Sequence, residues 1–168
     1  TQKGLWRYSR PDSVLTAVGK IRHQVINDIL FDRDSNLVIG SDAGLYVYDR
    51  TSMRHLEHDS RDRLSLSDND IESLMADRDG NTWLGTHDGV SVAKCWSMAE
   101  FVPLSSFTGS GKGLSISTMI PPDSRHGLWC GGSNGMAYLS PDGGESRIFD
   151  IYDKRYPLPH NTVHSMCR

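Results

Sequence analysis

The sequence lacks a long hydrophobic run and a concentration of positive charge. No segment approaches the roughly eighteen apolar residues of a membrane-spanning helix, and the first residues, TQKGLWRYSR, lack the apolar centre of a signal peptide. Lys and Arg total 18 against 21 Asp and Glu, for a net charge of −3. The basic residues are scattered and form no stripe, so we expect no nucleic-acid partner.

Cysteine is also scarce, with 3 residues in 168. Cys95, Cys130 and Cys167 show no C-x-x-C spacing and no neighbouring histidine at the spacing of a zinc site. Their odd number indicates no disulfide framework. Cys130 follows Trp129 in a predicted strand, where we expect a buried free thiol. No metal site and no cofactor are predicted.

Glycine, in contrast, recurs at a fixed interval. Two sets of glycines share spacings of 45 and 46 residues: Gly40, Gly85 and Gly131, and Gly44, Gly89 and Gly135. A period of about 40 to 50 residues built from short strands is typical of β-propeller blades, each a four-stranded antiparallel sheet. The fold class predicted is therefore all-β.

The central repeat illustrates the strand pattern. The alternating run DIESLMAD (70–77) predicts a first strand, and TWLGT (82–86) predicts a second after an Asp/Gly turn. A short turn with HDG then leads to GVSVAK (89–94), the third strand. A weaker and more polar fourth strand is expected within 99–105. The other two repeats carry the same pattern.

The repeats divide the chain into three full blades and two incomplete ones, so we expect a partial propeller that belongs to a longer protein. GLWRY near the N-terminus resembles GLYVY in the first full repeat, and NTVHSM near the C-terminus resembles NDIESL in the second. The predicted units are the tail of a preceding blade (1–20), three blades (21–65, 66–110 and 111–157) and the first strand of a following blade (158–168).

The Asp/Gly turn of the central repeat has a second interpretation. In DRDGN, residues Asp77, Asp79 and Asn81 occupy positions one, three and five of a calcium-binding loop. Such a loop needs glycine at position six, where this chain has Thr82. The third repeat keeps the glycines but loses the acids, which favours a turn over a metal site. GNTW also partly matches the sialidase Asp-box.

The stretch from Ile71 to Val90 reads I-x-S-L-x-x-D-x-D-G-N-x-W-x-G-T-x-x-G-V and closely resembles the two-component regulator propeller repeat. The copy from Ile26 is similar, with Val38 in place of the tryptophan. The copy from Ile116 is similar, with one inserted residue and no acid pair. The resemblance covers nearly the whole chain.

The resemblance implies a non-catalytic sensor. Members of this family form the periplasmic part of hybrid two-component regulators in the inner membrane, where they precede a membrane helix and a histidine kinase. Some respond to oligosaccharides. The implied partners are an oligosaccharide or other small ligand and the remainder of the propeller and sensor protein. The alternative is a propeller enzyme resembling a streptogramin lyase or a sialidase.

Strand alternation predicts where a ligand binds. Turns between second and third strands and the connections between blades emerge on one face, while the Asp/Gly turns emerge on the other. Polar residues on the first face could hydrogen-bond sugar hydroxyls or a uronate. The candidate ligand-binding residues are Asp42, Arg61, Arg63, Asn69, His87, Asp88 and Asn134. No catalytic residue is predicted.

Incomplete blades leave strand edges without partners. Closed propellers have about four to eight blades, so three full blades cannot complete a ring. Unpaired edges pair readily with other chains. We therefore expect the isolated chain to self-associate.

Overall fold

A computed structural model describes residues 4–18, 21, 24–93, 101–103, 114–122, 127–140 and 146–167. Cys95 lies outside these residues. The described part contains strands and no helix, so the predicted all-β fold is confirmed. It accordingly holds no helix that could cross a membrane.

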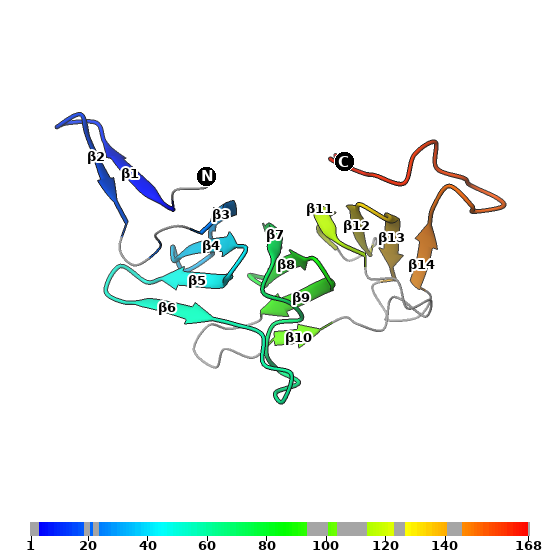
Figure 1. Ribbon diagram of the computed structural model, residues 1–168, viewed down its shortest axis with the longest axis horizontal. Coiled ribbons are helices and arrows are strands. Elements are labelled where there is room, and N and C mark those ends of the chain that lie inside the picture. The colour runs from blue at the N-terminus through cyan, green and yellow to red at the C-terminus, as the bar shows by residue number, and fades with distance from the viewer. Residues whose placement is uncertain are drawn as a thin grey trace.

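Three four-stranded antiparallel sheets, here called blades 1, 2 and 3, follow one another along the chain (Figure 1). Blade 1 consists of β3 (Ile26–Phe31), β4 (Leu37–Ser41), β5 (Gly44–Tyr48) and β6 (Met53–Leu56). Blade 2 consists of β7 (Ile71–Ala76), β8 (Thr82–Thr86), β9 (Gly89–Ala93) and β10 (Phe101–Pro103). Blade 3 consists of β11 (Ile116–Ile120), β12 (Leu128–Gly132), β13 (Gly135–Leu139) and β14 (Ser146–Phe149).

Within each blade the strands are neighbours in sequence order, so each blade is a meander. The first strands β3, β7 and β11 lie on the inner side of the arc, and the fourth strands lie on its outer side (Figure 1). Contacts join β3 to β7 and β7 to β11. This is the arrangement of consecutive blades in a propeller. The arc is open, as expected of a partial propeller. The residue ranges given above for each blade unit stay predictions.

The contact between neighbouring blades is built on a glycine in the second strand. A Cβ atom on Gly40 would lie 2.8 Å from Cγ2 of Ile71, and one on Gly85 would lie 2.7 Å from Cγ2 of Ile116. Both isoleucines are buried and begin the first strand of the next blade. Because interiors are close-packed, a larger side chain at either glycine would push the blades apart.

A β-bulge accompanies each of these contacts. The register shifts fall between Ile26 and Asp28, between Ile71 and Ser73, and between Ile116 and Thr118. The residue after the bulge then bonds to the next blade: Asp28 Oδ2 accepts from the Leu74 amide at 2.8 Å, and the Ser73 hydroxyl donates to the Ile116 carbonyl at 3.0 Å. A bulge re-aims a side chain, and here it aims a polar group across the seam between blades.

The hydrophobic cores lie across these seams. One buried cluster joins Val38 and Leu45 of blade 1 to Ile71 and Leu84 of blade 2. A second joins blade 2 to blade 3 and includes Cys130, whose pKa burial raises to about 12. Cys130 is therefore the buried free thiol that the sequence predicts.

The C-terminal segment differs from its prediction. The sequence predicts a first strand within 158–168, but no strand is assigned to its described residues. The segment still docks beside blade 3, because the Val163 amide donates to the Gly132 carbonyl at 2.9 Å. A Cβ on Gly131 would lie 2.7 Å from Val163 Cγ1, the same contact that the isoleucines make in the other blades. A strand also needs a hydrogen-bonded neighbour within its sheet, and the described residues provide none here.

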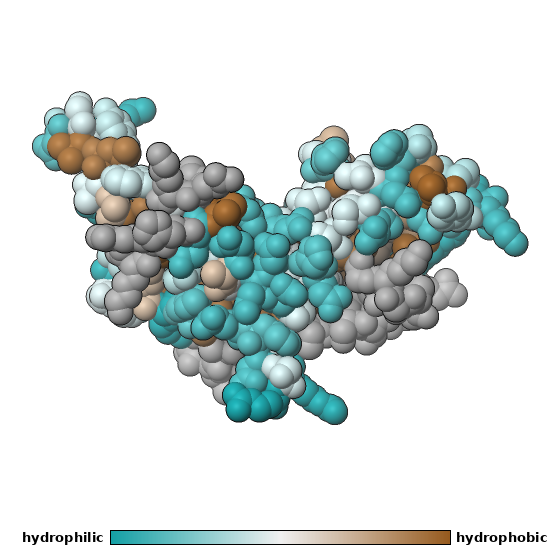
Figure 2. All heavy atoms as spheres, in the orientation of Figure 1, coloured by the Kyte–Doolittle hydropathy of each residue, from teal (hydrophilic) through white to brown (hydrophobic). Residues whose placement is uncertain are grey.

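The N-terminal segment forms a separate hairpin of β1 (Trp6–Ser9) and β2 (Val14–Ala17). It projects from one end of the arc (Figure 1). Large apolar and aromatic side chains are exposed on this hairpin: Trp6, Tyr8, Val14 and Leu15. Figure 2 shows a brown, hydrophobic area on the hairpin. A two-stranded ribbon is marginally stable alone, so this hairpin presents an uncovered apolar surface.

The glycine contact can be tested by a double-mutant cycle. Gly40→Ala inserts a methyl group against Ile71, and we expect it to lower the free energy of unfolding by about 1–3 kcal/mol. Ile71→Ala leaves a cavity and is expected to cost about 2–5 kcal/mol. Because the added methyl group fills part of that cavity, the double variant should lose less than the sum, which urea denaturation measures. Additive losses would contradict a direct contact.

Candidate functional site

The Asp/Gly turn of blade 2 is satisfied by the chain itself. Asp77 Oδ1 accepts hydrogen bonds from the amides of Asp79 and Asn81, both at 2.9 Å. Its Oδ2 accepts from Asn81 Nδ2 at 2.7 Å and from Trp83 Nε1 at 2.8 Å. Asp32 and Asn36 repeat the amide and side-chain bonds in blade 1. With both oxygens engaged, this motif is a turn, and the calcium interpretation has no support in the geometry.

These bonds also affect the ionisation of Asp77. Partial burial raises the pKa of this carboxyl, but the hydrogen bonds from Asn81, Trp83 and Asp79 outweigh it, and the pKa lies below its ordinary value of 3.8. The ionised form is therefore favoured in the folded chain. Trp83 itself packs against the core between blades 2 and 3.

The opposite end of the blades, here called the hairpin face, carries the turns at 42–43, 87–88 and 133–134. Each of the first two turns is bonded to the connection that enters the next blade: the Gly44 amide donates to the Asn69 carbonyl at 2.7 Å, and the Gly89 amide donates to the Leu114 carbonyl at 3.2 Å. Gly44 and Gly89 adopt φ values of +106° and +97°, which glycine tolerates. The predicted grouping of these turns with the interblade connections agrees with this geometry.

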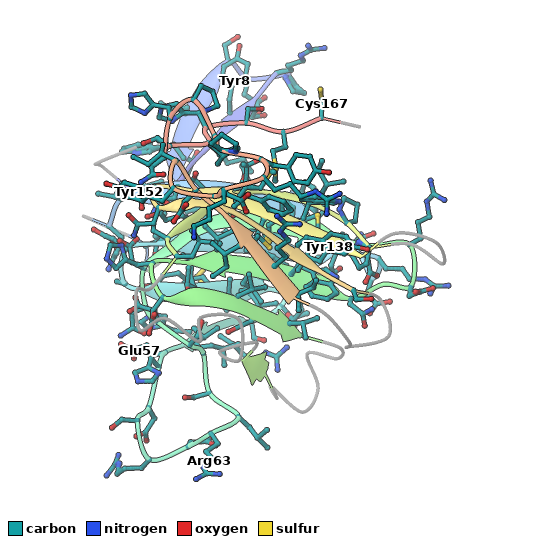
Figure 3. All side chains as sticks on the ribbon, turned by 90° about the vertical axis from the view of Figure 1, so that its right-hand side faces the viewer. Tyr8, Glu57, Arg63, Tyr138, Tyr152 and Cys167 are labelled. Atoms are coloured by element: carbon teal, nitrogen blue, oxygen red, sulfur yellow. The ribbon has the colours of Figure 1, made fainter. Side chains whose placement is uncertain are left out.

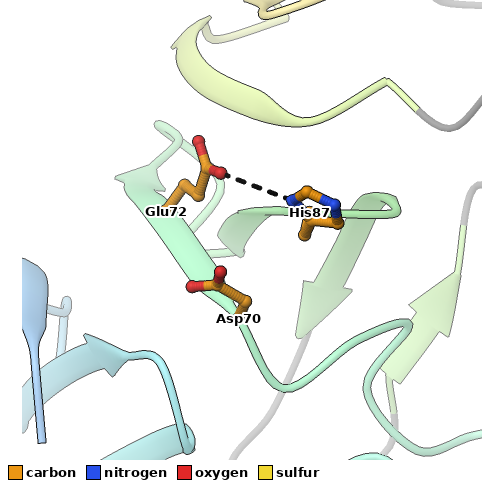
Figure 4. A group of neighbouring side chains, drawn as sticks. All are labelled: Asp70, Glu72 and His87. Carbon is orange, nitrogen blue, oxygen red and sulfur yellow. Dashed lines mark ion pairs between the residues drawn. The ribbon is translucent and has the colours of Figure 1, made fainter.

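Asp70, Glu72 and His87 come together on the hairpin face (Figure 4). Asp70 precedes β7, Glu72 is the second residue of β7, and His87 follows β8. One ligand atom of each residue lies within 4.8 Å of the others. His87 Nδ1 is 3.8 Å from Glu72 Oε1, and the amide of His87 donates to the Asp70 carbonyl at 3.0 Å. The strand β7 and the turn after β8 therefore hold the three side chains at one place.

Neighbouring blades add one polar residue each to this cluster. From blade 1, Asn27 Nδ2 donates to Asp70 Oδ1 at 3.3 Å and to the Ile71 carbonyl at 3.0 Å. At the entry to blade 3, the Ser115 hydroxyl donates to Glu72 Oε1 at 2.6 Å. Burial, followed by repulsion from Glu72, raises the pKa of Asp70. The site thus spans two seams near the inner strands.

The sequence singles out His87 but not its two acidic neighbours. Asp70 and Glu72 are two residues apart, and such residues point to the same side of an extended chain. That spacing is a usable signal. Their approach to His87 also depends on the register in which β7 pairs with β8. The sequence pattern predicts the two strands but not this register.

The other predicted ligand residues on the hairpin face have different surroundings. Asp42 Oδ1 accepts from the Val25 amide at 3.0 Å, and Asn69 Oδ1 accepts from the His58 amide at 2.7 Å, so both side chains hold the backbone. Asp88 and Asn134 are exposed in their turns. A ligand role for these residues stays a prediction.

Arg61 and Arg63 lie on the long connection between blades 1 and 2. In Figure 3 the part of this loop that carries Arg63 extends away from the sheets. Arg61 forms a two-point contact with Asp59, from Nε and Nη2 at 3.0 Å each, although its side chain is 88% exposed. Arg63 is exposed and forms no ion pair within the described part of the chain. A ligand role for the two arginines stays a prediction.

The family model described as two component regulator propeller matches residues 65–88, the segment that contains β7, the Asp77 turn and the Asp70–Glu72–His87 cluster. Residues 65–88 are a two component regulator propeller repeat. Among curated proteins, none matches the chain significantly.

Solved structures from this class of regulators resemble the chain along nearly its whole length. The extracellular domain of a proposed hybrid two component system from B. thetaiotaomicron is 33% identical, with 98% of this chain and 23% of that chain covered and a TM-score of 0.52. The corresponding domain of a second such system from B. thetaiotaomicron is 18% identical, with 89% and 22% covered and a TM-score of 0.67.

A bacterial surface protein shares the fold. PorZ, a component of the type-IX secretion system of Porphyromonas gingivalis, is 12% identical, with 99% of this chain and 27% of that chain covered and a TM-score of 0.64. The chain therefore spans about a quarter or less of these structures. At this low identity the similarity to PorZ concerns the fold alone.

The bond between Trp83 and Asp77 yields a pH-dependent prediction. Trp83→Phe keeps a ring in the core but removes the indole donor, and we expect a loss of about 1.5–3 kcal/mol of unfolding free energy at pH 7. The folded pKa of Asp77 is lowered below 3.8. Its stabilising effect is therefore present above the unfolded pKa and is lost as pH falls through the folded pKa. The difference between variant and wild type should therefore be smaller well below pH 3.8 than at pH 7.

Trp129→Phe is the matched control, because blade 3 has the equivalent tryptophan but no acid pair in its turn. Urea denaturation at the two pH values should show no comparable pH dependence for this variant. An equal pH dependence in both variants would exclude the Asp77 bond as its cause.

Proposed function

We propose that this chain is part of the extracytoplasmic sensor region of a hybrid two-component regulator, anchored in the inner membrane by other segments. In this proposal the propeller responds to a small ligand, an oligosaccharide, and the signal passes to a histidine kinase outside these residues. The 33% identity to one such extracellular domain, over 98% of the chain, is the observation that carries the proposal.

A non-catalytic role is supported by the 33% identical relative, which is the extracellular domain of a proposed hybrid two component system. The motif that most resembles an enzyme site, the Asp77 turn, has its carboxylate oxygens occupied by donors of the chain. The Asp70–Glu72–His87 cluster offers polar groups for binding at the seams. We therefore favour a binding module over the lyase-like or sialidase-like alternative.

The ligand surface proposed is the hairpin face with the adjoining interblade loop. It combines exposed hydrogen-bonding groups of both charges, from His87 and Asp88 on one turn to Arg61 and Arg63 on the loop. Planar guanidinium groups bind carboxylates with two parallel bonds, so these arginines suit a uronate. Asp42, Asn69 and Asn134 border the same face and complete the proposed set.

Substitutions on the two faces test this surface in the regulator that carries the chain. Arg61→Ala, Arg63→Ala and His87→Ala should each raise the inducer concentration for half-maximal signalling by about 10- to 100-fold, the effect of losing a charge-assisted bond. A transcriptional reporter with an oligosaccharide series measures this. The control is Asp79→Ala, an exposed acid on the opposite face. If Asp79→Ala abolishes the response while the three other variants are silent, the ligand binds elsewhere.

We also propose that the isolated chain self-associates through its open ends. The β1–β2 hairpin leaves Tyr8 and Leu15 each 59% exposed, and these residues face one another across the pair. Light scattering should show a mass above that of a monomer at high concentration. Leu15→Lys should reduce association several-fold, since charge on an edge opposes pairing. Leu64→Lys, at an exposed loop leucine, is the matched control. A monomer at every concentration would refute the proposal.

A further inference from the structure

The Asp70–Glu72–His87 cluster carries an inference that does not depend on a sensor role. It presents two carboxylates and one imidazole within 4.8 Å of each other (Figure 4). The donor atoms around a zinc ion lie about 2.0–2.2 Å from the metal, so neighbouring donors are roughly 3–3.5 Å apart. His87 is 68% exposed at its side chain and can turn by the small amount required.

The charges of the cluster favour a cation. Asp70 and Glu72 are both partly buried, and their carboxylate oxygens lie within 4.8 Å of one another, so the two negative charges repel. Their side-chain hydrogen-bond donors are a neutral amide from Asn27 and a neutral hydroxyl from Ser115. The ring of His87 lies 3.8 Å from Glu72. Among the described residues, no Lys or Arg pairs with either acid. A bound cation would supply the missing positive charge.

The backbone and neighbouring blades hold the donors in place. The Asp70 carbonyl accepts from the amide of His87, which ties the turn after β8 to the entry of β7. Asn27 and Ser115 orient the two carboxylates from the blades on either side. Hydrogen bonds to ligating carboxylates are a regular feature of metal sites, where they orient the ligands.

The donor set selects the kind of metal. An imidazole nitrogen suits Zn²⁺ and its first-row neighbours, whereas Mg²⁺ and Ca²⁺ prefer oxygen ligands alone. Three protein ligands also leave room for water or an oxygen of a ligand. The exposure of His87 places that open position towards solvent on the hairpin face.

We propose that Asp70, Glu72 and His87 bind one divalent transition-metal ion of the Zn²⁺ type at the seam between the blades. The ion is held by one nitrogen and two carboxylate groups, and its remaining positions are open to solvent. It joins the first strand of blade 2 to the turn after β8. No electron transfer or covalent step is involved.

Titration of the metal-free chain with ZnCl₂ in a calorimeter tests the site, and Co²⁺ absorption reports the donor set. His87→Ala and Glu72→Gln should each weaken binding by at least about tenfold, as removing even an outer partner of a ligand costs 10- to 100-fold. Asp88→Asn removes the adjacent exposed acid outside the cluster and should bind as the wild type does. Arg63→Ala should also retain the metal, because Arg63 belongs to the proposed sensing surface but lies outside the cluster.

Circular dichroism of each variant confirms that it is folded. His87→Ala removes an exposed side chain and is the decisive variant, since its loss need not disturb the blades. Metal binding in the wild type that falls in His87→Ala but not in Asp88→Asn supports the site. Absence of binding in the wild type, unchanged binding in His87→Ala, or an equal loss in Asp88→Asn would each overturn it.

Discussion

The contact between a glycine in one blade and a β-branched side chain in the next organises the rest of the structure. Gly40 faces Ile71, Gly85 faces Ile116, and Gly131 faces Val163, and a Cβ atom added to each glycine would lie 2.7–2.8 Å from a side-chain carbon of its partner. The absence of a side chain on the second strand lets the first strand of the following blade come close. The buried clusters then form across the seams, so neighbouring blades stabilise one another.

That packing also determines where polar groups meet. With the first strands drawn together, the turn after each second strand reaches the connection into the next blade, and the amides of Gly44 and Gly89 bond there. The Asp70–Glu72–His87 cluster sits at this junction, with Asn27 and Ser115 reaching it from the neighbouring blades. A ligand or ion bound there would contact groups from more than one blade. Such a position suits a sensor, because binding can alter how blades are packed.

The sequence predicts the repeating parts of this fold well. The glycine period and the alternation of apolar residues depend on local geometry and on one packing contact that recurs in every blade, so they are visible in a single sequence. The weak fourth strand of the central repeat also falls within its expected segment, 99–105, as β10 shows. The segment around Val163 is the exception, since strand pairing requires a neighbour that the pattern of one segment cannot supply.

The candidate site was harder to predict, because it depends on contacts between segments. Asp70 and Glu72 appear in the sequence as ordinary polar positions beside a strand, and only the β7–β8 pairing brings them to His87. The bonds that Asp42 and Asn69 accept from backbone amides likewise join segments that the sequence pattern does not connect. Arg61 bonds to Asp59 across a loop whose shape the sequence does not specify.

Amide hydrogen exchange at Val163 tests the central role of the seam most directly. This residue belongs to no sheet, yet its amide donates to the Gly132 carbonyl and its side chain faces Gly131. If blade-to-blade docking stabilises the fold, the Val163 amide should exchange at least about tenfold more slowly than the amides of exposed neighbours in the same segment. Exchange at the rate of those neighbours would contradict the account.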